Sequence, residues 1–166
     1  SWRVDQAVLK PCDVSEAIVA WQARVFADVP SDSIRVGRPL RSRSGAFVVG
    51  GWSATVFCPG RNEPGRWSDI IAVGRLLHRA LASVDRPGWL TDRTDPWAVA
   101  DRAAWGDISL APFRWAPHVA RLEEYLRPVR APSQLIHGDL TGNVLFADPL
   151  PPAMIDFSPY WRPVEF

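Results

Sequence analysis

The first third of the chain consists of short stretches in which apolar and polar residues alternate, interrupted by one helical pattern. Residues 2–10 alternate loosely and finish in an apolar pair, which predicts a strand that ends at Lys10. Over residues 13–28 apolar side chains recur every three or four positions, as on one face of an amphipathic helix. Residues 34–42 and 46–57 resemble strands joined by a turn. The pattern therefore predicts strand, helix, strand, strand.

The pattern becomes mainly helical after Cys58-Pro59-Gly60, which breaks the strands, and residues 61–66 resemble a connector. Three helices are expected, each bounded by a capping residue, a proline or a glycine, at residues 68–85, 95–106 and 117–127. The two parts of the chain therefore differ in their predicted secondary structure.

Short strand-like stretches return near the C-terminal end of the sequence, at residues 134–137, 144–146 and 153–155. Polar residues 138–143 follow the first stretch, and Asp156 follows the third. A small sheet that presents side chains from its loops is a common rigid base for a catalytic site. We therefore expect the chemistry of this protein in these loops.

Composition and charge limit the possible function. The chain has 166 residues, 47% of them hydrophobic, which is ample for a buried core in which we expect most of the nine tryptophans. A net charge of +1 indicates neither a nucleic-acid partner nor an anionic membrane surface. No apolar run reaches the roughly 20 residues that span a bilayer. Two cysteines without a signal-peptide pattern favour a reducing compartment, so we expect a cytoplasmic protein.

The basic residues are unusual, because Lys10 is the single lysine beside eighteen arginines. An arginine-rich codon bias explains such a ratio on composition alone. A specific role for Lys10 therefore depends on the residues around it.

Asp139, Asn143 and Asp156 form the most informative group of side chains in the sequence. Phosphoryl transfer needs a carboxylate that orients the attacking hydroxyl and accepts its proton, and oxygen ligands that hold Mg²⁺ against the phosphates. These three residues can fill those roles. Two carboxylates that converge on one site repel each other unless a dication lies between them, so the group predicts a metal.

The motifs His137-Gly138-Asp139, Asn143 and Ile155-Asp156-Phe157 resemble the signature of the aminoglycoside phosphotransferase family, relatives of the protein kinases. Within that superfamily the sequence is similar to an actinobacterial branch. The resemblance implies that Asp139 is the catalytic base and that Asn143 and Asp156 are Mg²⁺ ligands. It also implies an ATP-dependent enzyme with a small-molecule acceptor.

The resemblance extends toward the N-terminus of the chain. Ala7-Val-Leu-Lys10 is similar to the third-strand motif, whose lysine holds the α- and β-phosphates of ATP. Val56-Phe57-Cys58-Pro59-Gly60 is similar to the hinge, where backbone groups of Phe57 and Cys58 would meet the adenine. Cys58 is then a small apolar wall residue rather than a nucleophile.

The sequence departs from the family pattern at two points. Three residues separate Asp139 from Asn143, whereas the kinase template has four, and an unusual backbone conformation at Gly142 would compensate. Kinases also place a glutamate in the helix after the lysine strand, but Glu16 in the first turn is the only carboxylate inside the predicted helix. Either Glu16 substitutes, the lysine is held differently, or nucleotide binding is impaired.

Two further groups of residues, a pair of histidines and a pair of aromatic residues, do not require a catalytic role. His78 and His118 have no ligand partner at i+4 in their helices and indicate no zinc site. Tyr160 and Trp161, after the metal motif, either belong to the core or border the active site.

We therefore expect an α+β, protein-kinase-like fold of two lobes. Residues 1–58 would form a partial β-rich nucleotide-binding lobe, and residues 59–166 a partial, mainly helical lobe with the catalytic and metal loops. Because no glycine-rich loop precedes Lys10, and because the sequence stops nine residues after Phe157 where the family would continue, we expect a chain that is cut at both ends. The predicted reaction moves the γ-phosphoryl group of ATP to a hydroxyl of a small molecule. The alternative is a catalytically inactive kinase-like module, and the acceptor and oligomeric state stay open.

Overall fold

The computed structural model describes residues 1–164 and divides the chain into two compact units. Unit 1 comprises Ser1–Asp85 and Gln134–Phe166, and unit 2 comprises Arg86–Ser133. The expected lobe boundary near residue 58 falls inside unit 1 and stays a prediction. Each unit is described separately below.

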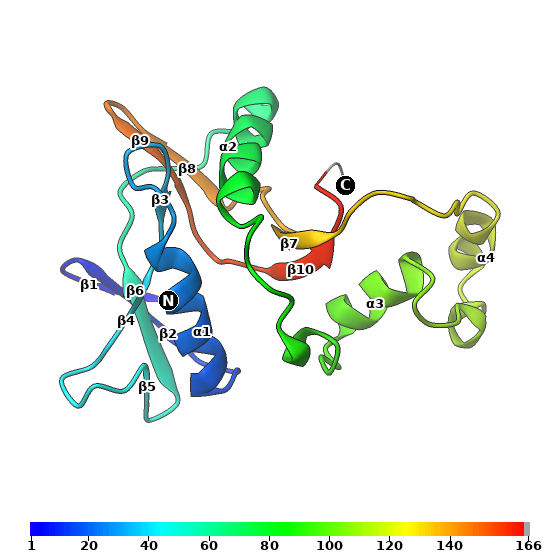
Figure 1. Ribbon diagram of the computed structural model, residues 1–166, viewed down its shortest axis with the longest axis horizontal. Coiled ribbons are helices and arrows are strands. Elements are labelled where there is room, and N and C mark those ends of the chain that lie inside the picture. Colours follow the sequence, from blue (N-terminus) through cyan, green and yellow to red (C-terminus); the bar gives the residue numbers. More distant parts are fainter. Residues whose placement is uncertain (165–166) are drawn as a thin grey trace. The chain divides into compact units, whose positions relative to one another are not determined.

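The largest sheet of unit 1 has five short antiparallel strands. In the order in which they pair, they are β1 (Trp2–Val4), β2 (Ala7–Pro11), β6 (Trp52–Val56) and β4 (Pro39–Leu40), and β5 (Val48–Val49) also pairs with β6. Figure 1 shows this sheet with the N-terminal helix beside it. The β2–β6 pairing is the longest, and it places Lys10 opposite Ser53.

The expected strand over residues 2–10 is two strands joined by a hairpin, so that prediction was wrong. Asp5, in the turn, has a φ of 50°, and an aspartate tolerates this left-handed conformation better than most residues. Gly50 and Gly51 split the strand expected over residues 46–57, because both glycines have positive φ angles between β5 and β6. Left-handed backbone at two successive positions is typical of tight hairpins.

Helix α1 (Glu16–Ala27) confirms the helix predicted from apolar spacing, with Ser15 at its N-cap. Its inward face buries Val19, Val25 and Phe26, of which Phe26 is only 1% exposed. The helix packs against β4 of the five-stranded sheet. Burial of this face, rather than capping, holds α1 in place, because the Ser15 side chain makes no cap hydrogen bond.

Two smaller sheets complete unit 1. β3 (Arg35–Val36) pairs in parallel with β9 (Leu150–Met154), which pairs in turn with β8 (Val144–Ala147). β7 (Gln134–His137) pairs antiparallel with β10 (Pro159–Arg162). The strands expected near 134–137, 144–146 and 153–155 are thus confirmed, whereas β10 was not predicted. β3 and β9 bring together segments from opposite ends of the chain.

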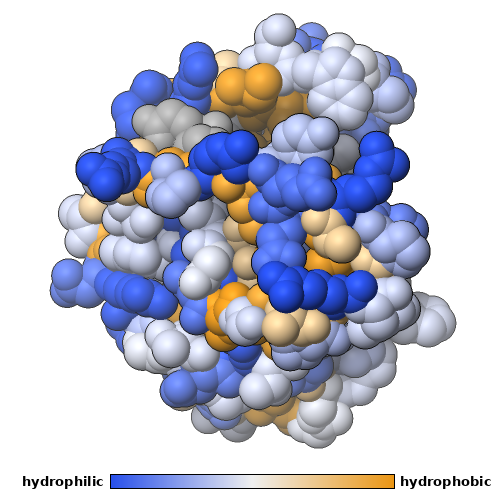
Figure 2. All heavy atoms as spheres, turned by 90° about the vertical axis from the view of Figure 1, so that its right-hand side faces the viewer, coloured by the Kyte–Doolittle hydropathy of each residue, from blue (hydrophilic) through white to orange (hydrophobic). Residues whose placement is uncertain are grey.

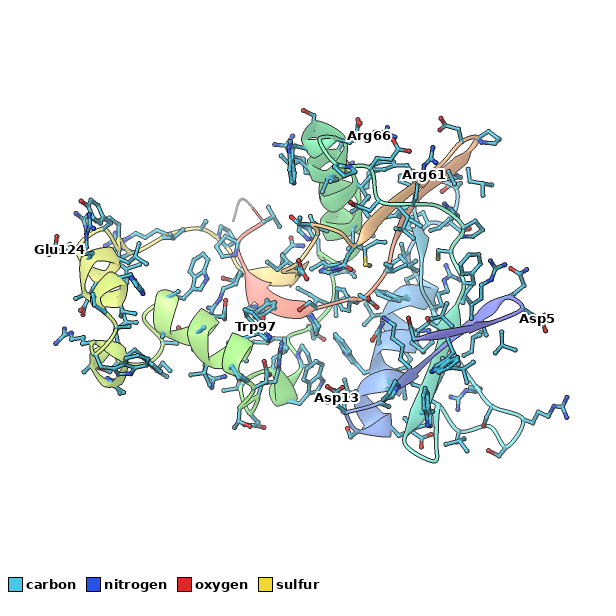
Figure 3. All side chains as sticks on the ribbon, turned by 180° about the vertical axis from the view of Figure 1, so that it is seen from behind. Asp5, Asp13, Arg61, Arg66, Trp97 and Glu124 are labelled. Atoms are coloured by element: carbon cyan, nitrogen blue, oxygen red, sulfur yellow. The ribbon has the colours of Figure 1, made fainter. Side chains whose placement is uncertain are left out.

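The predicted connector between β6 and the next helix is fixed to β8. The backbone of Arg61 exchanges two hydrogen bonds with Phe146, and the Arg66 guanidinium lies 3.8 Å from the centre of the Phe146 ring (Figure 3). Gly60 has a φ of 140°, and a Cβ at this position would lie 3.0 Å from the Phe146 carbonyl oxygen. Only glycine fits this close approach of two backbones.

Helix α2 (Trp67–Ala80) carries one continuous buried face that packs against β7. The buried residues recur at helical spacing and include one glycine and one histidine among the aliphatic side chains: Ile70, Val73, Gly74, Leu77 and His78. The next turn adds Leu81, which is fully buried. This face contacts the loop after β7 through Gly74, which lies against Leu140.

Unit 2 contains two short helices, α3 (Pro96–Ala104) and α4 (Pro117–Glu123), and two single 3₁₀ turns. The Asp95 carboxylate caps α3 by accepting a hydrogen bond from the Ala98 N–H, as the Asp-Pro start predicted. α4 is shorter than predicted, because hydrogen bonds from residue i+3 to residue i replace the α-helical pattern after Glu123.

The expectation that most tryptophans lie in the core was wrong. Five of the nine are exposed, and the most exposed are Trp97 at 77% and Trp115 at 84%, both in unit 2. Figure 2 shows hydrophobic side chains separated by hydrophilic ones on the face that α4 belongs to.

No helix formed by residues 1–164 has the length and apolar character needed to cross a membrane.

Candidate functional site

Two predicted site residues from opposite ends of the chain meet in unit 1. The Lys10 ammonium on β2 forms an ion pair with the Asp156 carboxylate, although 146 positions separate them. Their side chains are 38% and 47% exposed, so both groups are open to solvent and to a ligand. The β2 register aims Lys10 at the loop that follows β9.

Asp156 has a left-handed backbone with a φ of 51°. Aspartate tolerates this conformation better than most residues, as at Asp5, and left-handed residues other than glycine concentrate at functional sites. The preceding Ile155 N–H donates to the Asn143 carbonyl, 2.9 Å away, and so ties the two loops together. The left-handed backbone thus occurs at the position where the sequence predicts a metal ligand.

The loop after β7 brings Asp139 and Asn143 into direct contact. The Asn143 side-chain amide donates to the Asp139 carbonyl at 2.8 Å and to Asp139 Oδ2 at 3.1 Å. Gly142 has a φ of 84°, so the shortened loop closes through the unusual conformation that we expected of it. Both partners of the amide are acceptors, so its NH₂ group faces them and Oδ1 points elsewhere.

His137 connects the two loops through its ring. Its Nδ1 accepts a hydrogen bond from the Asp139 N–H at 3.1 Å, and its Nε2 lies 3.2 Å from the Ile155 carbonyl. These partners require a neutral ring that is protonated on Nε2. Burial lowers the pKa of His137, which stabilises this neutral form. The histidine is therefore a structural member of the loop.

Phe157 anchors the predicted metal motif to the core. Its ring packs edge-on against Phe26 of α1, with centroids 5.1 Å apart, and against the His137 ring at 5.5 Å. Edge-to-face aromatic pairs contribute about 0.5–1.5 kcal/mol beyond the area they bury. The residue after Asp156 is therefore held on two sides.

Two glycines allow side chains to approach the loop after β7. A Cβ on Gly138 would lie 2.3 Å from a ring carbon of Tyr160, and a Cβ on Gly74 of α2 would lie 2.4 Å from a methyl carbon of Leu140. Tyr160 thus packs directly on the glycine before Asp139. Leu140 sits on the buried face of the helix.

The oxygen donors suit Mg²⁺ held together with a phosphate ligand. A carboxylate from Asp156 and the unbonded Oδ1 of Asn143 are hard oxygen ligands of the kind that Mg²⁺ prefers. Within residues 1–164, no group of three or more His, Cys, Asp or Glu side chains could hold a metal. An ion at these residues therefore needs further oxygens from phosphates or water, which is usual for Mg²⁺ in kinases.

The predicted hinge residues lie at the other end of the β2–β6 pair from Lys10. The Phe57 N–H donates to the Gln6 carbonyl at 2.8 Å, and Gln6 lies four residues before Lys10, which is about 14 Å at 3.4 Å per residue of extended strand. Across residues 1–164, the backbone N–H and carbonyl of Cys58 make no hydrogen bond. Phe57 and Cys58 are thus not in contact with the other predicted site residues.

Cys58 has the surroundings of a packing residue. It is 6% exposed, and burial raises the pKa of its thiol, while the positive charge of Arg35 opposes that shift. A thiol that stays protonated is a poor nucleophile. This agrees with its interpretation as an apolar wall residue.

The expected lysine–glutamate pair is absent from the described part of the chain. Glu16 lies at the start of α1, where its Oε1 accepts a hydrogen bond from the Phe47 N–H at 3.0 Å. Lys10 is bound to Asp156 instead. In the described residues Lys10 pairs with Asp156 rather than with Glu16, and the effect on nucleotide binding stays a prediction.

Sequence reasoning missed one residue that contacts the loop and left another between two interpretations. His78 of α2, which was missed, accepts the His137 N–H at 3.1 Å. A signal for His78 was present, because a glycine and a histidine one turn apart interrupt the aliphatic face of the predicted helix. Tyr160, which the sequence placed either in the core or at the border of the active site, packs on Gly138 from a strand that was not predicted.

Comparisons with known proteins identify the family of the chain and its fold. Residues 13–159 match the model of the phosphotransferase enzyme family. The chain is similar to a solved aminoglycoside phosphotransferase from Alicyclobacillus acidocaldarius subsp. acidocaldarius, with 16% identity and a TM-score of 0.56 over 95% of this chain and 58% of that one. It is also similar to the gentamicin-APH(2″)-IIa complex, with 13% identity and a TM-score of 0.55 over 97% of this chain and 62% of that one. A search of curated proteins found no match.

These likenesses confirm the α+β, kinase-like fold class. At such identities they concern the fold alone. The chain spans 58% and 62% of the length of the two solved proteins. The family match begins at residue 13 and therefore does not include Lys10.

Proposed function

This chain belongs to the phosphotransferase enzyme family over residues 13–159, and we propose that it transfers the γ-phosphoryl group of ATP to a hydroxyl of a small molecule. The ion pair between Lys10 and Asp156 carries the proposal, because it joins a predicted phosphate ligand to a predicted metal ligand. The Ile155 N–H bond to Asn143, which in turn contacts Asp139, links this pair to the proposed base.

In this proposal the Asp139 carboxylate orients the acceptor hydroxyl and accepts its proton. As the hydroxyl oxygen bonds to the γ-phosphorus, the bond from that phosphorus to the β-phosphate oxygen breaks, and ADP leaves. Lys10 binds the α- and β-phosphates once its pair with Asp156 opens. Exposed ion pairs contribute only about 0–1 kcal/mol, so opening this one costs little.

Asp156 and the Oδ1 of Asn143 would hold Mg²⁺ beside these phosphates. When bound, the ion neutralises the charge that develops on the phosphate oxygens. The Asn143 amide also keeps the Asp139 carboxylate in one orientation, because it donates to both the backbone and the side chain of that residue. Asn143 would thus couple the metal site to the base.

The adenine would lie at Phe57 and Cys58. The free backbone groups of Cys58 supply a donor and an acceptor for a purine edge, and the Arg3 guanidinium covers one face of the Phe57 ring at 3.7 Å.

The thiols of Cys12 and Cys58 are both free, which agrees with a cytoplasmic location.

An inactive nucleotide-binding or scaffold module is the second candidate. One observation favours it: Glu16 is bound to the Phe47 N–H, so the glutamate that active kinases pair with the lysine has no equivalent at Lys10. Binding and catalysis must therefore be tested separately.

The binding test is a thermal-shift titration with ATP and MgCl₂. At a hundred times its Kd, a ligand stabilises the native state by about 2.7 kcal/mol. We expect a shift that needs both ATP and Mg²⁺ and that Asp156→Asn abolishes. A shift that is the same without Mg²⁺, or in Asp156→Asn, contradicts the metal assignment.

The catalytic test is a panel of hydroxyl compounds, including sugars, amino alcohols and aminoglycosides, assayed with wild type and Asp139→Asn. Turnover that is lost in the variant, with the thermal shift retained, identifies an enzyme with Asp139 as its base. Full turnover by Asp139→Asn contradicts that role. A nucleotide-dependent shift without turnover of any acceptor favours the inactive module.

A further inference from the structure

Within residues 1–164, β7 is bonded to another strand along one edge only. In the β7–β10 pairing His137 lies opposite Pro159, and the next residue, Gly138, donates its N–H to the Ser158 carbonyl at 2.9 Å. Because successive N–H groups of a strand point to opposite edges, the His137 N–H points away from β10. In the core, this donor needs another acceptor, since an unsatisfied buried N–H is costly.

A side chain of α2 supplies that acceptor. His78 is 6% exposed, and its Nε2 lies 3.1 Å from the His137 nitrogen. Burial lowers the pKa of His78 to about 4, with a further contribution from His137, so the ring is neutral near pH 7. The Nε2 lone pair is therefore available to the strand under ordinary conditions.

The same face of α2 holds the loop on the other side of Asp139. Gly74 lies one helical turn before His78, and the missing side chain leaves room for Leu140. The helix thus contacts residues 137 and 140, which flank the proposed base. A second hydrogen bond, from Gln134 Nε2 to the His78 carbonyl at 2.6 Å, joins the same two elements at the far end of β7.

We infer that His78 is a positioning residue of this phosphotransferase, which fixes the His137 backbone and thereby the orientation of Asp139. The chain of contacts is short: His78 binds the His137 N–H, and the His137 ring in turn binds the Asp139 N–H. The catalytic consequence rests on the proposed function. The ordering of residues 137–143 by His78 does not depend on the proposed function.

The competing explanation is a buried histidine that stabilises the core and nothing more. Gln134 offers a matched control, because Gln134→Leu also removes a hydrogen bond between α2 and β7 but leaves the His137 N–H paired. His78→Leu removes the acceptor, and His78→Gln keeps one, since the glutamine Oε1 can take the place of Nε2. Leu140→Ala removes the second contact of α2 with the loop.

Hydrogen exchange of the whole chain, without nucleotide, tests the ordering. We expect His78→Leu and Leu140→Ala to raise the exchange rate of amides 137–143 by about tenfold or more relative to Gln134→Leu, with His78→Gln close to wild type. Equal exchange in this segment for His78→Leu and Gln134→Leu would overturn the inference. If His78→Leu does not fold, the same comparison between Leu140→Ala and Gln134→Leu decides.

ATP turnover, with water or any acceptor found in the panel, tests the catalytic consequence. A base misplaced by about 1 Å can lower turnover by about a hundredfold. We expect His78→Leu to lose at least tenfold in kcat with a nearly unchanged KM for ATP, and His78→Gln to recover it. A loss of kcat in His78→Leu that is only equal to the loss in Gln134→Leu contradicts a positioning role for His78. If wild type neither binds nor turns over ATP, the proposed function fails, and hydrogen exchange alone decides whether His78 orders the loop.

Discussion

Unit 1 and unit 2 are built from similar side chains but bury them to different extents. In unit 1 Phe26, Leu77 and Leu135 are at most 1% exposed, whereas Leu90, Ala98 and Ala103 are the only buried apolar residues of unit 2. Unit 2 relies more on local contacts, such as the Asp95 cap and the ion pair of Arg114 with Glu123. Every predicted site residue lies in unit 1, where packing can hold it in one geometry.

The difference shows what a catalytic loop requires of its surroundings. Residues 138–143 form no helix or strand, but side chains from α2 and β10 and the backbone after β9 contact them and the adjoining His137. Each contact is a polar pair or a close approach to a glycine. The geometry of this loop is therefore fixed by the packed elements around it. The segments of unit 2 have no comparable packing around them.

The largest effect is expected from Asp139→Asn, which tests whether the chemistry belongs to unit 1. Loss of the base should lower phosphoryl transfer by about 10²–10⁴-fold, while the thermal shift with ATP and Mg²⁺ stays, because the amide cannot accept the proton. Glu124→Gln, at the exposed end of α4, is the control from unit 2 (Figure 3). A loss of phosphoryl transfer in Glu124→Gln equal to that in Asp139→Asn would contradict the assignment of the chemistry to unit 1.

A pair of leucines tests the difference in packing. Leu77 is fully buried in unit 1, and Leu122 is 63% exposed in unit 2. Leu77→Ala should reduce the free energy of unfolding by about 2–5 kcal/mol, since it leaves a cavity. Leu122→Ala should change it by at most about 0.5 kcal/mol. Urea titrations followed by tryptophan fluorescence measure both values, and similar losses would show that α4 is buried in solution.

Acid should destabilise unit 1 through His78. Its pKa falls from 6.5 to about 4 on folding, so the folded state binds fewer protons and the stabilisation is complete above pH 6.5. It should be lost as the pH falls from 6.5 toward 4, by at most about 3 kcal/mol. Unfolding midpoints measured across this range should fall less steeply for His78→Gln than for wild type. Parallel curves would refute the assignment to His78.

The smallest effects are expected from the polar contacts of unit 2. Asp95→Ala removes the α3 cap and should cost about 1 kcal/mol in the stability of unit 2. Arg114→Gln breaks an exposed ion pair and should leave the unfolding midpoint within experimental error. Calorimetry in low and high salt separates the two variants. A larger loss for Arg114→Gln, removed by salt, would mean that ion pairs rather than caps hold unit 2.

The sequence carried enough information for the helices and for most of the strands. Apolar spacing predicts α1 and α2, and the Asp-Pro start predicts α3, because these signals are local. The hairpin at Asp5 and strand β10 were not predicted. The hairpin depends on a left-handed aspartate, and β10 depends on its pairing with β7, which is far away in the sequence.

For the candidate site, motif spacing predicted which residues matter but not how they contact one another. Asp139 and Asn143 are four positions apart, so their contact could be anticipated once Gly142 was recognised as a turn residue. The pair of Lys10 with Asp156 could not, because its geometry depends on the packing of β2 against a loop 146 positions away. The binding of Glu16 to Phe47 is another long-range contact of this kind.

The parallel pairing of β3 with β9 has a consequence for the order in which this chain folds. Arg35 of β3 donates to the Pro151 carbonyl across 116 positions, and all of unit 2 lies within that interval. A ribosome therefore releases unit 2 before unit 1 has received its last strands. Strand β3 must therefore wait without its partner β9 until residue 154 has emerged from the exit tunnel. Slow synthesis of residues 134–154 would prolong the exposure of β3, and chaperones that bind extended backbone would act during this interval.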